Sequence, residues 1–188
     1  MQIRLQNVRI SFPNLGRPQA YGDGEPAYQA KFIIDPKSEQ SKLLKDTIKA
    51  VAVEQWKDTA DSVLKRLTSD KKIAYVEDEY ASAKTGEVYD GFQGKHYLSA
   101  RNAKTRPTIL DRHGNPVHDA SEIERLIYAG SYVHAMIDIW AQDNKWGRRV
   151  NATLQGVMFA GEGDSFGGGK VASTDDFADL AQAADDLI

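Results

Sequence analysis

The sequence predicts a mainly β protein with added α-helices and an acidic C-terminal tail. Residues 128–159 alternate apolar and polar side chains over two long runs, whereas residues 36–69 repeat apolar side chains at helical spacing. A Gly-rich stretch then precedes a segment rich in Asp. With 188 residues, of which 41% are hydrophobic, the chain can bury one core. We therefore expect one domain over residues 1–160, a flexible linker over 161–170 and the tail over 171–188.

Residues 128–159 are predicted to form a long β-hairpin around a turn at residues 142–147. The register that sets Ala141 opposite Arg148 also pairs Ile139 with Val150, Ile137 with Ala152 and Ala135 with Leu154. These pairs place apolar side chains on one face, which we expect in the core. The other face carries Trp140 beside Arg149, and Trp146 lies in the turn, so we expect the polar side of the hairpin to bind a partner.

Two strands are predicted before residue 35. Residues 2–12 alternate, with one slip near Asn7 that a β-bulge would absorb. Residues 13–18 and 22–26 are rich in Pro and Gly, so we expect a surface loop there. Residues 27–34 form the second predicted strand.

A helix is predicted to follow, with Asp35 as its N-cap and Pro36 at its first position. Its apolar stripe consists of Leu44, Ile48, Val51, Ala52 and Trp56. A second, shorter helix is expected to end near Ser69. Both helices are expected to pack over the sheet, and the spacing of Trp56 places its ring in the core.

Short strands are predicted over residues 72–80, 87–92, 95–102 and 108–110, followed by a short helix over 119–127. In the strand at 95–102, alternation separates two rows of side chains: Lys95, Tyr97, Ser99 and Arg101 on one face, and Leu98 and Ala100 on the other. We expect the first row to face outward and the second row to enter the core.

The composition narrows the class of protein. The chain has no Cys, so it has neither a disulfide framework nor thiolate metal ligands, as is common in a reducing compartment. The first residues alternate like a strand instead of forming the cationic head and apolar run of a signal peptide. No segment is long and apolar enough to span a membrane. We therefore expect a soluble cytoplasmic protein.

No catalytic or metal-binding motif is complete in the sequence. Residues 163–170 resemble a phosphate-binding loop only superficially, because the first Gly and the final Ser or Thr of that pattern are missing. The spacing of His113, His118 and Asp119 matches no established set of metal ligands. The acidic residues 77–79 are expected at an exposed strand edge, where the middle one faces away from its neighbours. We therefore predict no enzyme, no cofactor and no metal site.

Cations and aromatic residues gather on the polar strand faces and in the loops. The candidate nucleic-acid-binding residues are Lys95, Tyr97, Arg101, Lys104, Arg106, Trp140, Trp146, Arg148 and Arg149. Single-stranded nucleic acid is held by such a set, because cations follow the phosphates while rings stack on the bases. The long helix predicted from residue 36 to residue 56 carries both charges, so it does not suggest a recognition helix for a duplex.

The chain also resembles a known family. The run YAGSYVHAMIDIWAQDNKWGRRVNATLQGVMF, with the Gly-rich stretch and the acidic tail after it, is similar to the tailed-phage single-stranded DNA-binding proteins long filed as a domain of unknown function. The similarity reaches from NVRISFPNL at residues 7–15 through the turn at residues 111–117 to that run. It implies an OB-fold, which is a Greek-key β-barrel of about five strands. It also implies a role in DNA replication or recombination in the host cell cytoplasm.

The acidic tail is the second binding element that this resemblance implies. Residues 171–188 contain five Asp and no Lys or Arg, so the net charge of −3 divides into −5 in the tail and +2 in the rest of the chain. The residues expected to act are Asp175, Asp176, Phe177, Asp179, Asp185 and Asp186. We expect them to recruit phage or host replication proteins and to compete with DNA for the basic groove.

Two other functions remain open at the level of sequence. A divalent-metal nuclease or recombination enzyme would use Glu77, Asp78, Glu79 or Asp111. A structural virion or interaction protein would instead dock on another subunit through Trp146. Cleavage of DNA with magnesium or manganese would indicate the first, and assembly that ignores nucleic acid would indicate the second. We expect a monomer or weak homodimer that binds single-stranded DNA and no membrane.

Overall fold

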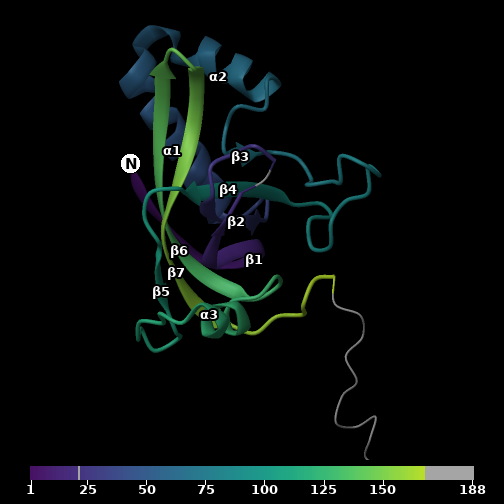
Figure 1. Cartoon of the computed structure of the whole chain (residues 1–188). Helices are drawn as coiled ribbons and strands as arrows, with labels where there is room; N and C mark the ends of the chain where they lie inside the picture. Colours follow the sequence, from purple (N-terminus) through teal and green to yellow (C-terminus); the bar gives the residue numbers. More distant parts are fainter. Residues whose placement is uncertain (21, 168–188) are drawn as a thin grey trace, which may run out of the picture.

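Strands dominate the computed structural model, which describes residues 1–20 and 22–167. In chain order the elements are β1 (Gln2–Gln19), β2 (Ala27–Ile34), α1 (Glu39–Trp56), a 3-10 turn η1 (Lys57–Thr59), α2 (Ala60–Ser69), β3 (Tyr75–Val76), β4 (His96–Asn102), β5 (Thr108–Leu110), α3 (Ala120–Leu126), β6 (Tyr132–Asn144) and β7 (Gly147–Gly161). Figure 1 shows the long β6–β7 hairpin rising beside α1 and α2. The predicted class, mainly β with added helices, is confirmed.

Five of the strands close into an OB-fold-like barrel. The strand order is β3-β4-β2-β1-β6-β7-β5, and an additional pairing of β4 with β7 joins the two sides. That pairing is parallel and brings Arg101 opposite Thr153. The other neighbours within the barrel pair antiparallel. The barrel implied by the family resemblance is therefore confirmed.

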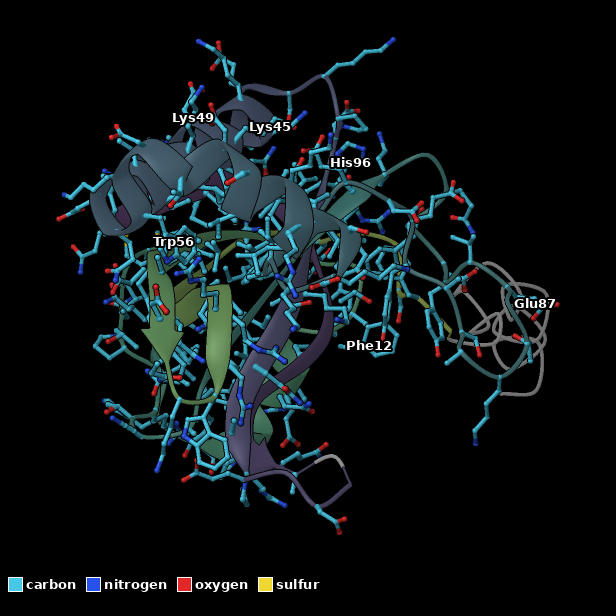
Figure 2. All side chains as sticks on the ribbon, turned by 90° about the horizontal axis from the view of Figure 1, so that it is seen from above. Phe12, Lys45, Lys49, Trp56, Glu87 and His96 are labelled. Carbon is cyan, nitrogen blue, oxygen red and sulfur yellow. The ribbon has the colours of Figure 1, made fainter. Side chains whose placement is uncertain are left out.

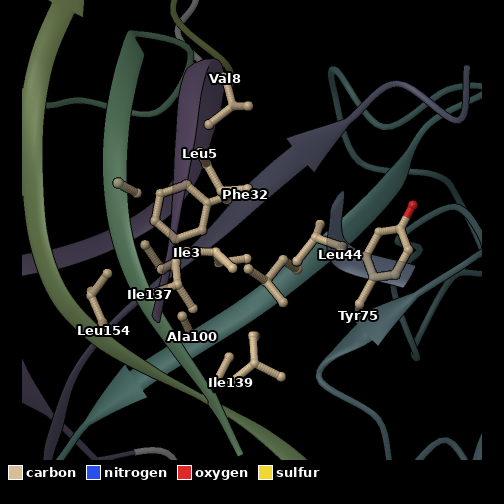
Figure 3. Close-up of a cluster of buried hydrophobic side chains, with 14 of the residues drawn as sticks. Ile3, Leu5, Val8, Phe32, Leu44, Tyr75, Ala100, Ile137, Ile139 and Leu154 are labelled. Carbon is tan, nitrogen blue, oxygen red and sulfur yellow. The ribbon is translucent and has the colours of Figure 1, made fainter. Parts of the chain in front are cut away.

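The core lies inside the barrel, where Figure 3 shows apolar side chains of the strands together with Leu44 of α1. Every second side chain of the strands points into this core, and Leu5, Phe32, Ile137 and Leu154 are all fully buried. From above, Leu44 of α1 is also fully buried, and burying such a side chain contributes roughly 1.5–3 kcal/mol. The predicted apolar stripe of α1 is therefore confirmed, including the buried ring of Trp56.

The hairpin is confirmed, but its predicted register is wrong by two residues. Ala141 pairs with Val150 instead of Arg148, and the strands run up to the pair of Asn144 with Gly147. Gly147 takes φ 99°, a left-handed conformation that closes a tight turn and shortens the predicted six-residue loop. Because side chains alternate with a period of two, a shift of two residues changes every partner and leaves every face unchanged.

Strand β1 is longer than predicted. The bulge near Asn7 is confirmed, because the pairing with β6 shifts register between Leu5 and Val8. The loop predicted at residues 13–18 is wrong, since β1 continues to Gln19. Its pairing with β2 shifts register twice after Ser11, and such irregular positions accommodate Pro without breaking a regular ladder.

The helices follow the prediction apart from the start of α1, which begins at Glu39 instead of Pro36. Ser38, not Asp35, is the N-cap of α1, and its hydroxyl accepts a hydrogen bond from the Ser41 amide. The Asp35 carboxylate accepts one from the Lys37 amide, which forms a turn before the helix. The predicted end of α2 at Ser69 is confirmed, as is the short helix α3.

The long connection between α2 and β4 departs most from the prediction. The strands predicted at residues 72–80 and 87–92 reduce to β3, with two residues, and to isolated bridges of Ile73 with Val150 and of Ala81 with Val88. Aromatic side chains organise this connection, and their packing does not require a regular ladder. The strands predicted at 95–102 and 108–110 are confirmed as β4 and β5. Within the described residues, no helix is long and apolar enough to cross a membrane.

Candidate nucleic-acid interface

A groove opens where β4 and β7 separate on one side of the barrel. Residues 72–74 insert between these strands: the Ala74 amide donates to the Val150 carbonyl at 2.8 Å, and the Val150 amide donates to the Lys72 carbonyl at 3.1 Å. On the other side, the Ser99 amide donates to the Ala74 carbonyl at 2.9 Å. The groove above this joint has a volume of about 600 Å³.

The charged residues that line the groove are all positively charged. Its cationic lining residues are Lys31, Lys71, Lys72, Arg101, Lys104 and Arg149, and none of the described residues that line it is Asp or Glu. A cleft lined by one sign of charge concentrates counterions of the opposite sign. The arrangement therefore suits a polyanion.

Lys31 of β2 lies at the centre of this surface. Its ammonium donates a hydrogen bond to the Ser99 hydroxyl at 2.8 Å and lies 4.2 Å from the ring centroid of Tyr80 and 5.0 Å from that of Tyr97. Burial disfavours the charged form and lowers the pKa of Lys31 to about 8. An incoming phosphate would favour the charged form of this ammonium.

An aromatic pocket continues from the groove. Its lining residues are Phe12, Gln29, Ala30, Lys31, Tyr80, Tyr89, Ser99, Ala100 and Arg101, around about 360 Å³. Tyr80 and Tyr89 stack at 5.0 Å, and Phe12 meets Tyr89 edge-on at 5.0 Å. In Figure 2, Phe12 lies between the barrel and the projecting connection that carries Glu87. Lys31 lines both the pocket and the groove, so the two form one surface.

The groove gathers several predicted residues from three strands and a loop. Five of the nine predicted binding residues line it: Tyr97, Arg101, Lys104, Trp140 and Arg149. The Trp140 side chain is 40% exposed and donates a hydrogen bond from Nε1 to the Thr153 hydroxyl at 3.0 Å. As predicted for β4, Leu98 and Ala100 are buried on the opposite face of the strand.

The remaining predicted residues lie around the groove. Lys95 forms an ion pair with Asp35 at 2.6 Å, which offsets its charge. Arg106 is half-buried, and its Nη2 is buried without a hydrogen-bond partner among the described residues. At the hairpin end, Trp146 is 78% exposed, and Arg148 pairs with Asp143 at 3.1 Å.

The hairpin end is fixed to the helical layer. Asp143 accepts a second hydrogen bond, at 2.9 Å, from the indole of Trp56 at the end of α1. Because Asp143 also pairs with Arg148, one carboxylate connects α1 to both strands of the hairpin. The exposed Trp146 therefore projects from a supported turn.

Several residues of this surface were not predicted. They are Phe12, Lys31, Lys71, Lys72, Tyr80 and Tyr89. Alternation in residues 27–34 contained a signal for Lys31, because Ala30 and Phe32 on either side of it are buried. No comparable signal marked residues 71–72, whose position depends on the insertion between β4 and β7.

The acidic residues weighed as metal ligands have other partners. Glu77 pairs with Lys45 at 2.7 Å, and the Asp111 carboxylate accepts hydrogen bonds from the amides of His113 and Asn115. Hydrogen bonds from Asn115 lower the pKa of Asp111. Within residues 1–20 and 22–167, no group of three His, Cys, Asp or Glu is arranged to hold a metal ion. The predicted tail residues, from Asp175 to Asp186, lie outside the described part of the chain.

A family model described as Enterobacter phage Enc34, ssDNA-binding protein, matches residues 1–188. Putative protein p50 of Acyrthosiphon pisum secondary endosymbiont phage 1 is 37% identical over 191 residues, which cover 99% of this chain and 97% of that protein.

The fold is shared with solved structures of phage proteins. The single-stranded DNA-binding protein from bacteriophage Enc34, in complex with ssDNA, has a TM-score of 0.71 at 24% identity, over 88% of this chain and 89% of that one. The single-stranded DNA-binding protein gp2.5 of bacteriophage T7 has a TM-score of 0.56 at 16% identity, over 95% of this chain and 93% of that one.

Proposed function

Because this chain belongs to the family of the Enterobacter phage Enc34 ssDNA-binding protein, we propose that it is a non-enzymatic, sequence-tolerant binder of single-stranded DNA. The observation that carries this proposal is the groove between β4 and β7, which six cations line. In this proposal the protein coats exposed single strands of DNA during phage DNA replication or recombination in the host cell.

The strand runs along the groove with its phosphates on Arg101, Lys104 and Arg149. Its bases face the rings of Tyr97 and Trp140 and enter the aromatic pocket beside Tyr80. Stacking on such rings requires unpaired bases and accepts any base, since every base has a π face. The cations and rings therefore favour single strands over duplexes and tolerate any sequence. Lys95, Arg106 and Arg148 flank this path, and the exposed ring of Trp146 stacks on a further base at the end of the hairpin.

Titrating the protein with oligo-dT is expected to quench Trp fluorescence, with an affinity that falls as salt rises. In Trp146→Ala, quenching should fall sharply and affinity should drop about fivefold, because losing one base stack costs about 1 kcal/mol. Circular dichroism is the control for folding of the variant. If the wild type shows no binding at low salt, the proposal is wrong. If the variant keeps its affinity and quenching, the hairpin end serves another purpose, such as docking on a protein.

The acidic tail is proposed to recruit replication proteins and to act as an intramolecular competitor of DNA. A truncated chain, residues 1–170, is expected to bind oligo-dT several-fold more tightly at low salt, because the tethered charges no longer occupy the groove. The gain should shrink as salt screens the attraction. Titrations at two salt concentrations measure this effect, and pull-down from infected cells measures recruitment. Equal affinities of the two chains at low salt would refute the competition.

A further inference from the structure

Residues 162–167, here called the strap, follow β7 and lie against the barrel. They fall in the predicted linker, yet Gly163 exchanges hydrogen bonds with the Tyr128 hydroxyl, and the Phe166 amide donates to the Ala129 carbonyl at 3.0 Å. The Gly167 amide reaches the Asp90 carboxylate at 3.3 Å. In Figure 1 the strap, in yellow, runs from the end of β7 towards the connection between β3 and β4.

Arg9 of β1 holds the strap in two ways. Its Nη2 donates to the Asp164 carbonyl at 2.6 Å, while its Nε donates to the Gly130 carbonyl at 3.0 Å. Its guanidinium also lies 4.2 Å from the ring centroid of Phe166, a cation–π contact. One side chain therefore fixes both the backbone of the strap and its aromatic ring.

Two glycines make room for the strap. A methyl group at Gly91 would collide with the Phe166 ring, and one at Gly130 would collide with the Asp164 carbonyl. Both glycines also take positive φ, at 85° and 109°. Such close approach by backbone from two separate segments indicates a built contact surface for the strap.

This contact surface adjoins the aromatic pocket. Phe166 shares a hollow of about 210 Å³ with Phe12 and Tyr89. The same Phe12 and Tyr89 line the aromatic pocket on their other side. These two rings therefore form a wall between the strap and the pocket, and the strap contacts residues 90–91 directly after Tyr89.

We infer that the strap is a positioning element of the nucleic-acid interface, which holds the wall of Phe12 and Tyr89 in place for a stacked base. The inference rests on the proposed function. Phe12 belongs to β1, whereas Tyr89 stands on a connection whose described backbone forms little regular structure, so the orientation of the Tyr89 ring depends on what packs behind it. Phe166 supplies that support from behind, while the cations of the groove contact the strand independently.

The test compares two ligands of equal length, oligo-dT and a fully abasic strand, in the full-length chain. Phe166→Ala removes the ring, and Arg9→Lys keeps the charge but removes the paired hydrogen bonds. Both variants are expected to lose about fivefold in affinity for oligo-dT, as for one base stack, while keeping their affinity for the abasic strand and their salt slope. Val53→Ala, an exposed change on α1, is the control.

The ratio of the two affinities separates positioning from a general loss of stability. If both variants keep the wild-type ratio, or if affinity for both ligands falls equally, the inference is wrong. If Phe166→Ala fails to fold, Arg9→Lys alone decides. Failure of the wild type to bind either ligand would instead contradict the proposed function.

Discussion

Replacing Arg101, Lys104 and Arg149 together by Ala is expected to weaken binding to oligo-dT about 100-fold in about 0.1 M salt. Each phosphate contact on a single strand contributes roughly 0.7 to the magnitude of the slope of log affinity against log salt. In about 0.1 M salt this corresponds to about a fivefold gain in affinity for each contact. The loss of three contacts should therefore make the salt dependence weaker, with the magnitude of the slope smaller by about 2. The three residues come from β4, the following loop and β7, so the change removes charge along the whole groove.

The matched control removes three exposed cations that do not line the groove, Lys42, Lys65 and Arg125. It changes the net charge by the same amount, so a general electrostatic effect would appear in both proteins. Titrations at several salt concentrations give the two slopes. If the groove variant and the control lose the same affinity and slope, the strand does not follow this groove.

Raising the pH from about 7 to about 9 is expected to weaken binding roughly tenfold through Lys31. Its pKa is lowered to about 8, so at pH 7 the ammonium of the free protein is mostly charged and at pH 9 it is mostly neutral. A bound phosphate favours the charged form and raises this pKa, so binding above pH 8 requires the uptake of a proton. The proton becomes scarcer as the pH rises, and affinity therefore falls.

Lys31→Met tests this assignment because it keeps the length of the side chain without its charge. The variant should bind more weakly than the wild type near pH 7 and show a flat profile up to about pH 9. A tenfold decline that persists in Lys31→Met would assign the proton to another group.

The fold was largely predictable because most of it is recorded in local periodicity. In the hairpin, alternation determines which face of the sheet Ile137 and Ile139 lie on. It does not determine which residue of the neighbouring strand each of them pairs with. The partner depends on the turn, where the left-handed Gly147 pairs with Asn144 and closes a tight turn at residues 145–146 instead of the predicted loop at 142–147. Pairing preferences alone favoured another register with equally apolar neighbours.

The site was less predictable because it is assembled from distant segments. Alternation identified Tyr97 and Arg101 on β4, which both line the groove. Lys71 and Lys72 reach the groove only because the segment after α2 inserts between β4 and β7, a tertiary event without a local pattern. Likewise, Tyr80 and Tyr89 come together through packing within an irregular connection.

The inserted segment has a consequence for the integrity of the barrel. Along the described strands, β4 and β7 pair directly only at Arg101 with Thr153, assisted by the Asn102 side chain, which donates to the Leu154 carbonyl at 3.1 Å. Parting this joint would expose two strand edges, and free edges invite pairing with other chains. On the proposed function, a DNA strand that contacts cations of both β4 and β7 would hold this joint closed, and it would stabilise the folded state in proportion to its occupancy. On the proposed function, DNA binding would thus also protect the protein against aggregation.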